Sequence, residues 1–315
     1  MDLIESNRRI VRTQRVYLNS SQAISVGKGV HGVFEEPNTK NPLSFDISSA
    51  LIQPDDSETI SVSLVHFACN GNINMFGDER TTINLKIFSP GGVQQMTVTL
   101  NTRPETTIYM GMSPSAVIEL INAEITTQSV PGITTQLILA PYLTTQTQPL
   151  YLVNAGTTDT INIYVNGTSK SIWDFLGLAR HKSTTQVNDY AIINPNTQPQ
   201  PVYQIPNTGV SRYITITSNL PQQNYCSHIN SSNILATVPL VCNQIQFDDD
   251  PVQSKPHSIW NYVYTNTVME GSHKAVGSIS PNLLTFNLFM NNGANAVMNG
   301  NWDIALEFKT LGRKK

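Results

Sequence analysis

The stretch that decides the fold is Ser280 to Phe308, SPNLLTFNLFMNNGANAVMNGNWDIALEF. Large apolar residues alternate with smaller or polar ones in two runs within it, at Leu284, Phe286 and Leu288 and again at Trp302, Ile304, Leu306 and Phe308. Such period-two alternation predicts a half-buried strand, and the Asn-Gly turn at 299–300 favours an antiparallel pair. Because an isolated pair of strands is not stable in water, we expect it to close a sheet whose other strands come earlier in the chain.

Earlier parts of the chain contain short runs of the same kind, separated by turns rich in Gly, Pro and Asn. Strands are predicted at residues 16–18, 43–47, 60–68, 82–87, 95–100, 133–139, 150–153, 160–165, 212–217, 234–239, 244–247 and 256–268. Two short helices are predicted at Ser113 to Thr126, with Pro114 at its first position, and at Ser171 to Gly177. The Pro-rich residues 181–210 are expected to form an extended loop. This order predicts an all-β sandwich or barrel, and a jelly roll accommodates long connections best.

Composition excludes several classes of protein. Only 13% of the 315 residues are charged, the formal net charge is −3 and the pI is about 6.1, so a nucleic-acid partner is not expected. The sequence has neither a membrane-spanning stretch nor a signal-like segment after Met1, which predicts folding in a reducing compartment. The three cysteines are accordingly expected to be buried thiols, with a Cys226–Cys242 disulfide as the alternative.

The sequence shows no arrangement of residues typical of catalysis. The six histidines are scattered and form no His-x-x-x-His pair, so we expect no catalytic residues, no cofactor and no transition-metal site. Asp248 to Asp250 is interpreted as a solvated turn, with a hard cation as the alternative. Trp302 and Phe308, like the aromatic residues of 260–264, are expected in the core, although they could stack sugars or bases.

Residues 1–15 carry four arginines and little periodicity. The candidate assembly residues are Arg8, Arg9, Arg12 and Arg15. This segment is interpreted either as a solvated tail or as an arm that docks on a neighbouring subunit or an internal partner, because Arg can pair with a carboxylate through two parallel hydrogen bonds.

Four pieces in order resemble the penton (vertex) and minor capsid proteins of double-jelly-roll DNA viruses, including virophages, polinton-like viruses and large DNA virus relatives. The pieces are the strands 16–20, 43–47 and 61–64, the helix 113–122 ending in Leu-Ile-Asn, the segment 172–177 ending in Leu-Gly, and the hairpin ending at 299–308. Members of this family often have a charged Ser-Arg-Asp-Arg-like run after the first strand, whereas this chain has Ser-Ser-Gln-Ala at 20–23.

The resemblance implies a viral jelly roll formed by residues 16–84 and 207–315, with residues 85–206 as an outward insertion of loops or a β subdomain. It also implies a structural virion protein without catalysis, made in the host-cell cytoplasm or virus factory and assembled as a homopentamer at the capsid vertex. The implied partners are other copies of the chain, major capsid protein capsomers, and internal minor capsid proteins or a host receptor. The alternatives are a cement protein between capsomers and a lectin-like glycan-binding β-sandwich.

Overall fold

The chain forms two compact units in the computed structural model. The structure describes residues 8–23, 25–26, 43–46, 55, 58–70, 72–103, 106–128, 136–141, 150–156, 158–182, 188–197, 205–206, 213–220, 233–240, 242–247, 257–265, 273–276 and 283–313. Unit 1 comprises Met1–Asp78 and Arg212–Lys315, and unit 2 comprises Glu79–Ser211. Unit 2 is therefore inserted in sequence between the two segments of unit 1.

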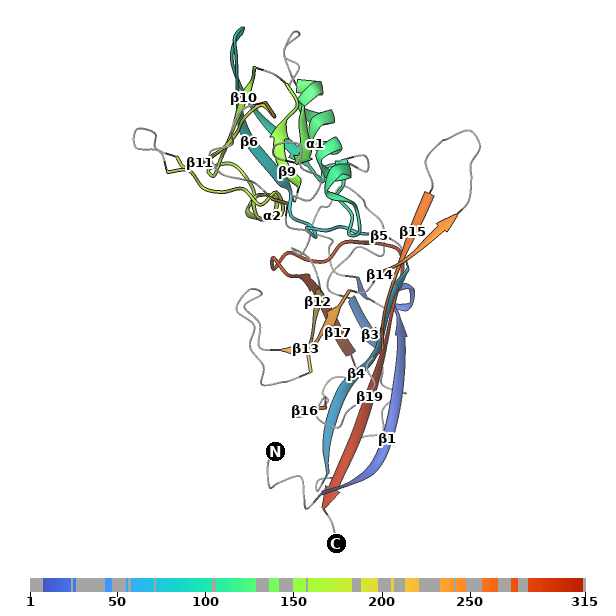
Figure 1. Ribbon diagram of the computed structural model, residues 1–315. Helices are drawn as coiled ribbons and strands as arrows, with labels where there is room; N and C mark the ends of the chain where they lie inside the picture. The colour runs from blue at the N-terminus through green and yellow to red at the C-terminus, as the bar shows by residue number, and fades with distance from the viewer. Residues whose placement is uncertain are drawn as a thin grey trace. The chain divides into compact units, whose positions relative to one another are not determined.

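One sheet of unit 1, sheet A, brings the two ends of the chain together. Its strands are ordered β1 (Arg8–Asn19), β19 (Trp302–Arg313), β4 (Thr59–Asn70), β15 (His257–Thr265) and β14 (Cys242–Phe247), and β16 (Lys274–Val276) also pairs with β4. Figure 1 shows β1, β19 and β4 running side by side as long strands. The expectation that the last strand joins residues near the start of the chain is thus confirmed.

The other large sheet of unit 1, sheet B, is also antiparallel. Its strands are ordered β13 (Ile234–Pro239), β12 (Tyr213–Ser218), β17 (Leu283–Met290), β3 (Leu43–Asp46) and β2 (Ser25–Val26). A short pair of β5 (Asn72–Ile73) and β18 (Met298–Asn299) completes the described strands of unit 1.

The strand order of the two sheets is that of a jelly roll. Eight strands numbered in chain order, β1, β3, β4, β12, β13, β15, β17 and β19, lie as 1-8-3-6 in sheet A and 2-7-4-5 in sheet B. The first therefore pairs with the eighth, the second with the seventh, the third with the sixth and the fourth with the fifth, all antiparallel. This nested pairing is produced by rolling up one long folded hairpin, so the predicted all-β jelly-roll sandwich is confirmed.

The predicted pairing of the two C-terminal strands with each other is wrong. β17 pairs with β12 and β3 in sheet B, whereas β19 pairs with β1 and β4 in sheet A. The two strands meet through side chains instead: the Trp302 ring lies 6.3 Å from Phe286 and 6.0 Å from Phe45, both edge to face, and 6.5 Å from Phe67. Trp302 therefore joins the two sheets in the hydrophobic core.

Unit 2 has its own sheets and both α-helices of the described residues, whereas the 3-10 helix Ser20–Gln22 belongs to unit 1. Its larger sheet has the order β11 (Tyr190–Ile193), β10 (Thr160–Tyr164), β6 (Thr81–Ser89) and β7 (Gly92–Leu100), and β8 (Leu137–Pro141) pairs with β9 (Leu150–Asn154). The helices are α1 (Pro114–Gln128) and α2 (Lys170–Phe175), close to the predicted ranges (Figure 1). Ser113 caps α1 as expected, because its Oγ accepts a hydrogen bond from the Ala116 amide at 3.2 Å.

Two details of unit 2 differ from the sequence-based expectation. The segment 181–210, expected to be a loop, contains β11, which pairs with β10. The strand β6 begins at Thr81 and pairs with β7 and β10, so residues 79–84 belong with unit 2 rather than with the jelly roll. The alternation of residues in β6 does not distinguish it from a jelly-roll strand. The boundary is set instead by its pairing partners β7 and β10, which lie in unit 2.

Candidate assembly surface

The four candidate arginines lie on a strand rather than on an arm. Residues 8–15, assigned to an N-terminal arm from the sequence, form most of β1, where Arg8 is opposite Arg313 and Arg15 opposite Glu307. Residues 1–7 lie outside the described residues. The long antiparallel ladder with β19 is the physical reason, since it pairs the backbone groups along one edge of a segment whose side chains show little apolar periodicity.

Two of these arginines have carboxylate partners within unit 1. Arg15 Nε donates a hydrogen bond to Glu307 Oε2 at 2.9 Å, and Arg12 Nη2 lies 3.5 Å from Glu58 Oε2. Hydrogen bonds from Arg15 to Glu307 and to Tyr17 raise the pKa of the guanidinium further above its ordinary value. Arg15 and Arg12 are therefore held along β1, with their side chains 53% and 26% exposed.

β1 also carries most of the exposed large apolar residues of unit 1 that the structure describes. Tyr17 is 71% exposed, Ile10 50% and Val11 46%, while Val16 and Leu18 are buried in the sandwich. Because β1 is the end strand of sheet A, one side of its backbone pairs with β19 and the other has no partner strand among the described residues. An edge strand with exposed apolar side chains is a template for association.

The sequence signal for this surface was present but incomplete. The arginines stand out in the sequence, whereas Ile10, Val11 and Tyr17 resemble core residues of a strand. Their exposure depends on β1 being at the edge of the sheet, which the pattern of residue types does not reveal. The candidate surface is defined here as the exposed side chains of β1: Arg9, Ile10, Val11, Thr13, Arg15 and Tyr17.

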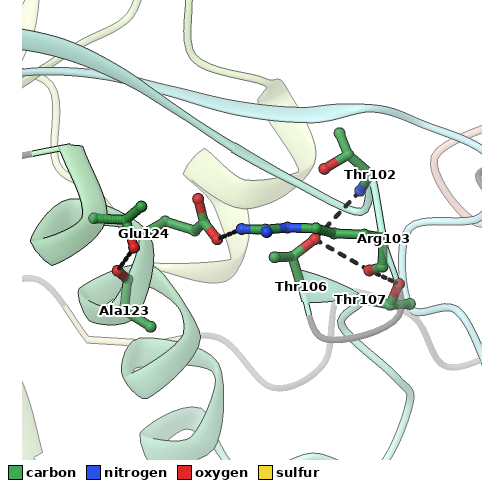
Figure 2. A network of polar contacts seen from close by, with 7 residues as sticks. Thr102, Arg103, Thr106, Thr107, Ala123 and Glu124 are labelled. Carbon is green, nitrogen blue, oxygen red and sulfur yellow. Dashed lines mark hydrogen bonds and ion pairs between the residues drawn. The ribbon is translucent and has the colours of Figure 1, made fainter.

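A polar network in unit 2 holds the loop after β7 against α1. Figure 2 shows Arg103 reaching Glu124, and Arg103 Nη2 and Glu124 Oε1 form an ion pair. The hydroxyls of Thr106 and Thr107 both donate to the Arg103 carbonyl oxygen, at 3.1 and 2.9 Å. The network therefore ties Arg103, and the threonines bonded to its carbonyl oxygen, to α1.

Several side chains that the sequence made candidates for chemistry have structural roles in the described part of the chain. Among the described residues no group of three or more His, Cys, Asp or Glu side chains could hold a metal ion. His66 Nδ1 lies 3.3 Å from Thr265 Oγ1, the hydrogen-bonded arrangement of a structural histidine. Trp302 and Phe308 are 2% and 3% exposed, so they form part of the core and no stacking platform. Asp248 to Asp250 lie outside the described residues.

The described cysteine side chain is a buried thiol. Cys69 is fully buried, and desolvation, followed by the nearby Asp303 carboxylate, raises its pKa to about 12. The thiolate that would act as a nucleophile is therefore strongly disfavoured. Cys226 lies outside the described residues.

None of the helices in the described part of the chain is long and apolar enough to cross a membrane.

Comparison with known proteins gives structural matches along nearly the whole chain. No family model and no curated sequence matches. The crystal structure of the mavirus penton protein matches with a TM-score of 0.48 and 12% identity, covering 95% of this chain and 99% of that chain. The cryo-electron microscopy structure of the Sputnik virophage matches with a TM-score of 0.39 and 15% identity, covering 94% and 98%. The family that the sequence resembles also includes penton proteins and virophages.

Proposed function

We propose that this protein is a structural subunit of a virus capsid that assembles as a homopentamer at the icosahedral vertex. The observation that supports this best is an eight-stranded jelly roll whose first strand, β1, exposes apolar side chains and arginines along a sheet edge. A ring of five copies needs a heterologous contact, in which one surface of a subunit meets a different surface of the next. The exposed edge of β1 supplies one of those two surfaces.

The remaining parts of the proposal follow from this role. The partners are further copies of the chain, neighbouring major capsid protein capsomers, and either internal minor capsid proteins or a host receptor. Unit 2 is the outward insertion, and the protein functions in the virion after synthesis in the host-cell cytoplasm or virus factory. It catalyses no reaction and recognises no nucleic-acid sequence.

The mass of the purified assembly tests the proposal. We expect native mass spectrometry to give five times the 34.7 kDa of one chain. A trimer would indicate a capsomer-like or cementing role instead, and a monomer at all concentrations would contradict the proposal.

The contribution of β1 is tested by Tyr17→Asp, which places a charge on the most exposed of the large apolar residues described. We expect the pentamer to dissociate at concentrations where the wild type remains assembled, because burying a carboxylate at an interface is costly. The matched control is Val93→Asp, which changes an apolar residue that is 63% exposed in unit 2. Equal loss of assembly in both variants would exclude a specific role for β1.

A further inference from the structure

A cluster of ionisable side chains around Glu307 lies on the face of sheet A that points away from the aromatic core. Along β19, Leu306 and Phe308 face the core together with Trp302, so the intervening Glu307 and Lys309 belong to the opposite face. Glu307 is nevertheless only 5% exposed. A charged residue buried this deeply needs partners.

Glu307 has three ionisable neighbours on three strands or their extensions. Its Oε2 accepts the hydrogen bond from Arg15 on β1, and its Oε1 lies 3.7 Å from Lys309 Nζ and 3.5 Å from His273 Nε2. His273 directly precedes β16, which pairs with β4 with Lys274 opposite Val62. The carboxylate therefore connects both terminal strands of the chain to β16.

The small side chain of Ser63 makes this contact possible. Ser63 on β4 is paired with Glu307, and one further step of the β4–β16 register places His273 on its other side. Glu307 and His273 are thus separated by the width of β4 and meet above Ser63, which is 2% exposed. Ser63 and Ser61, which β4 places opposite Glu307 and Lys309, do not titrate, and the histidine that β4 contributes to this face, His66, lies further along the strand opposite Ala305.

The imidazole of His273 is buried. Its side chain is 7% exposed, and neither ring nitrogen has a hydrogen-bond partner among the described residues. The charged groups that face it from the described residues are Glu307 and Lys309 on β19, with Arg15 on β1 behind Glu307. With one carboxylate and two cations in the cluster, a protonated imidazole would be a third cation beside Glu307, and the most deeply buried of the three.

The electrostatic balance in this cluster favours a neutral imidazole. Desolvation and then Lys309 lower the pKa of His273, and together they outweigh the opposing effect of Glu307. Burial alone would raise the pKa of Glu307, but Arg15, Lys309 and His273 overcome it, so that pKa is lowered. Glu307 is therefore ionised and His273 uncharged at neutral pH.

We propose that His273 is a proton-binding site whose occupation loosens the attachment of β16 to sheet A. Protonation adds a third cation around Glu307, which already pairs with Arg15 and Lys309, and the imidazolium, whose side chain is 7% exposed, gains solvent when β16 separates from β4. The proposal concerns the jelly roll alone and does not depend on the proposed function.

The direction of the pH effect follows from linkage. The pKa of His273 is lower in the folded than in the unfolded chain, where it is about 6.5, so the unfolded chain binds more protons as the pH falls below about 6.5. The stabilisation from a neutral His273 is present above about pH 6.5 and is lost as the pH falls from there through the folded-state pKa. Glu307 titrates in a more acidic range, because its folded-state pKa is below its ordinary value.

The test compares thermal unfolding of the intact wild-type protein and H273Q at pH 7.5 and pH 5.5. We expect acidification to lower the wild-type Tm of unit 1 by a few degrees, on the order of 2–4 °C, and H273Q to lose most of that drop. Hydrogen exchange of residues 273–276 should be faster in the wild type than in H273Q at pH 5.5. At pH 7.5 the two proteins should exchange at the same rate. An equal drop in Tm in both proteins would overturn the proposal.

Two further variants complete the test. K309M removes a cation of the cluster and retains the imidazole, so it should also reduce the acid-induced drop in Tm. If H273Q fails to fold, the result for K309M decides the question. His181, which is exposed in unit 2, supplies the matched control. H181Q should keep the full wild-type drop, and a reduced drop in H181Q would contradict a specific role for His273.

Discussion

The two units of this chain are built from contacts of different range. In unit 1 the longest ladder joins β1 to β19, so residues near position 10 pair with residues near position 311. In unit 2 the longest ladder is the β6–β7 hairpin, whose strands are separated by two residues, and α1 follows closely. The jelly roll therefore requires both ends of the chain, whereas unit 2 contains its own pairing partners.

The two segments of unit 1 that flank the insertion both contact the turn at Asn291 and Asn292. The Tyr213 amide donates to Asn291 Oδ1 at 3.3 Å, and Asn292 Nδ2 donates to the Phe76 carbonyl oxygen at 3.2 Å. Residues before and after the insertion are therefore held together within unit 1, independently of unit 2. Such an arrangement is what allows a jelly roll to tolerate a long insertion between its third and fourth strands.

Truncation of the chain should give the largest difference between the two units, because it tests whether unit 2 folds without unit 1. We expect residues 79–211 expressed alone to unfold cooperatively, with Trp173 as their single tryptophan and fluorescent reporter. A full chain lacking residues 302–315 should lose the unfolding transition of unit 1 and keep that of unit 2, because β19 lies between β1 and β4. Denaturant titration measures both transitions. Failure of residues 79–211 to fold would show that the units depend on each other.

Trp302→Ala should destabilise unit 1 by about 3–5 kcal/mol, because it opens a cavity among Phe45, Phe67 and Phe286. The unfolding transition of unit 2, measured in the same denaturant titration, should be unchanged. Trp302→Phe serves as the control that fills more of the space, and it should cost clearly less. A change in the transition of unit 2 as large as that of unit 1 would contradict independent cores.

Gly177→Ala should destabilise unit 2 by roughly 1–3 kcal/mol. Gly177 follows α2 with φ +63°, and a Cβ there would lie 1.8 Å from the Ile205 carbonyl oxygen. Gly91→Ala is the matched control, since its Cβ would meet only Ser89 Oγ at 3.8 Å. Thermal unfolding should show a lower Tm for unit 2 in the first variant and little change in the second.

Arg12→Ala should have the smallest effect, about 0–1 kcal/mol on unit 1, because the backbone ladder of β1 remains and only the contact with Glu58 is lost. Lys170→Ala, which removes an exposed pair with Asp174 on α2, is the corresponding change in unit 2. Denaturant titration should give similar small losses for both. A loss of several kcal/mol in Arg12→Ala would mean that the side-chain pair, rather than the ladder, holds β1 in place.

Local signals in the sequence predicted the parts of the molecule that depend on near neighbours. Residues close together in the sequence determine the cap at Ser113, the apolar face of α1 and the hairpin between β6 and β7. The strand β11 was missed because it has four residues in a Pro-rich segment and is stabilised by pairing with β10. Of the candidate surface on β1, the sequence singled out only the arginines, since the exposure of Tyr17 depends on sheet position.

By itself, the sequence determined that the chain is sheet-rich, that Trp302 and Phe286 point into a core, and where the helices begin. Only the tertiary structure decided that β17 and β19 belong to opposite sheets, that β1 is an edge strand, and that His273 meets Glu307 across Ser63. The physical reason is that alternation records which face of a strand is buried. The neighbour of each strand is chosen by long-range pairing and packing, for which period-two alternation contains no signal.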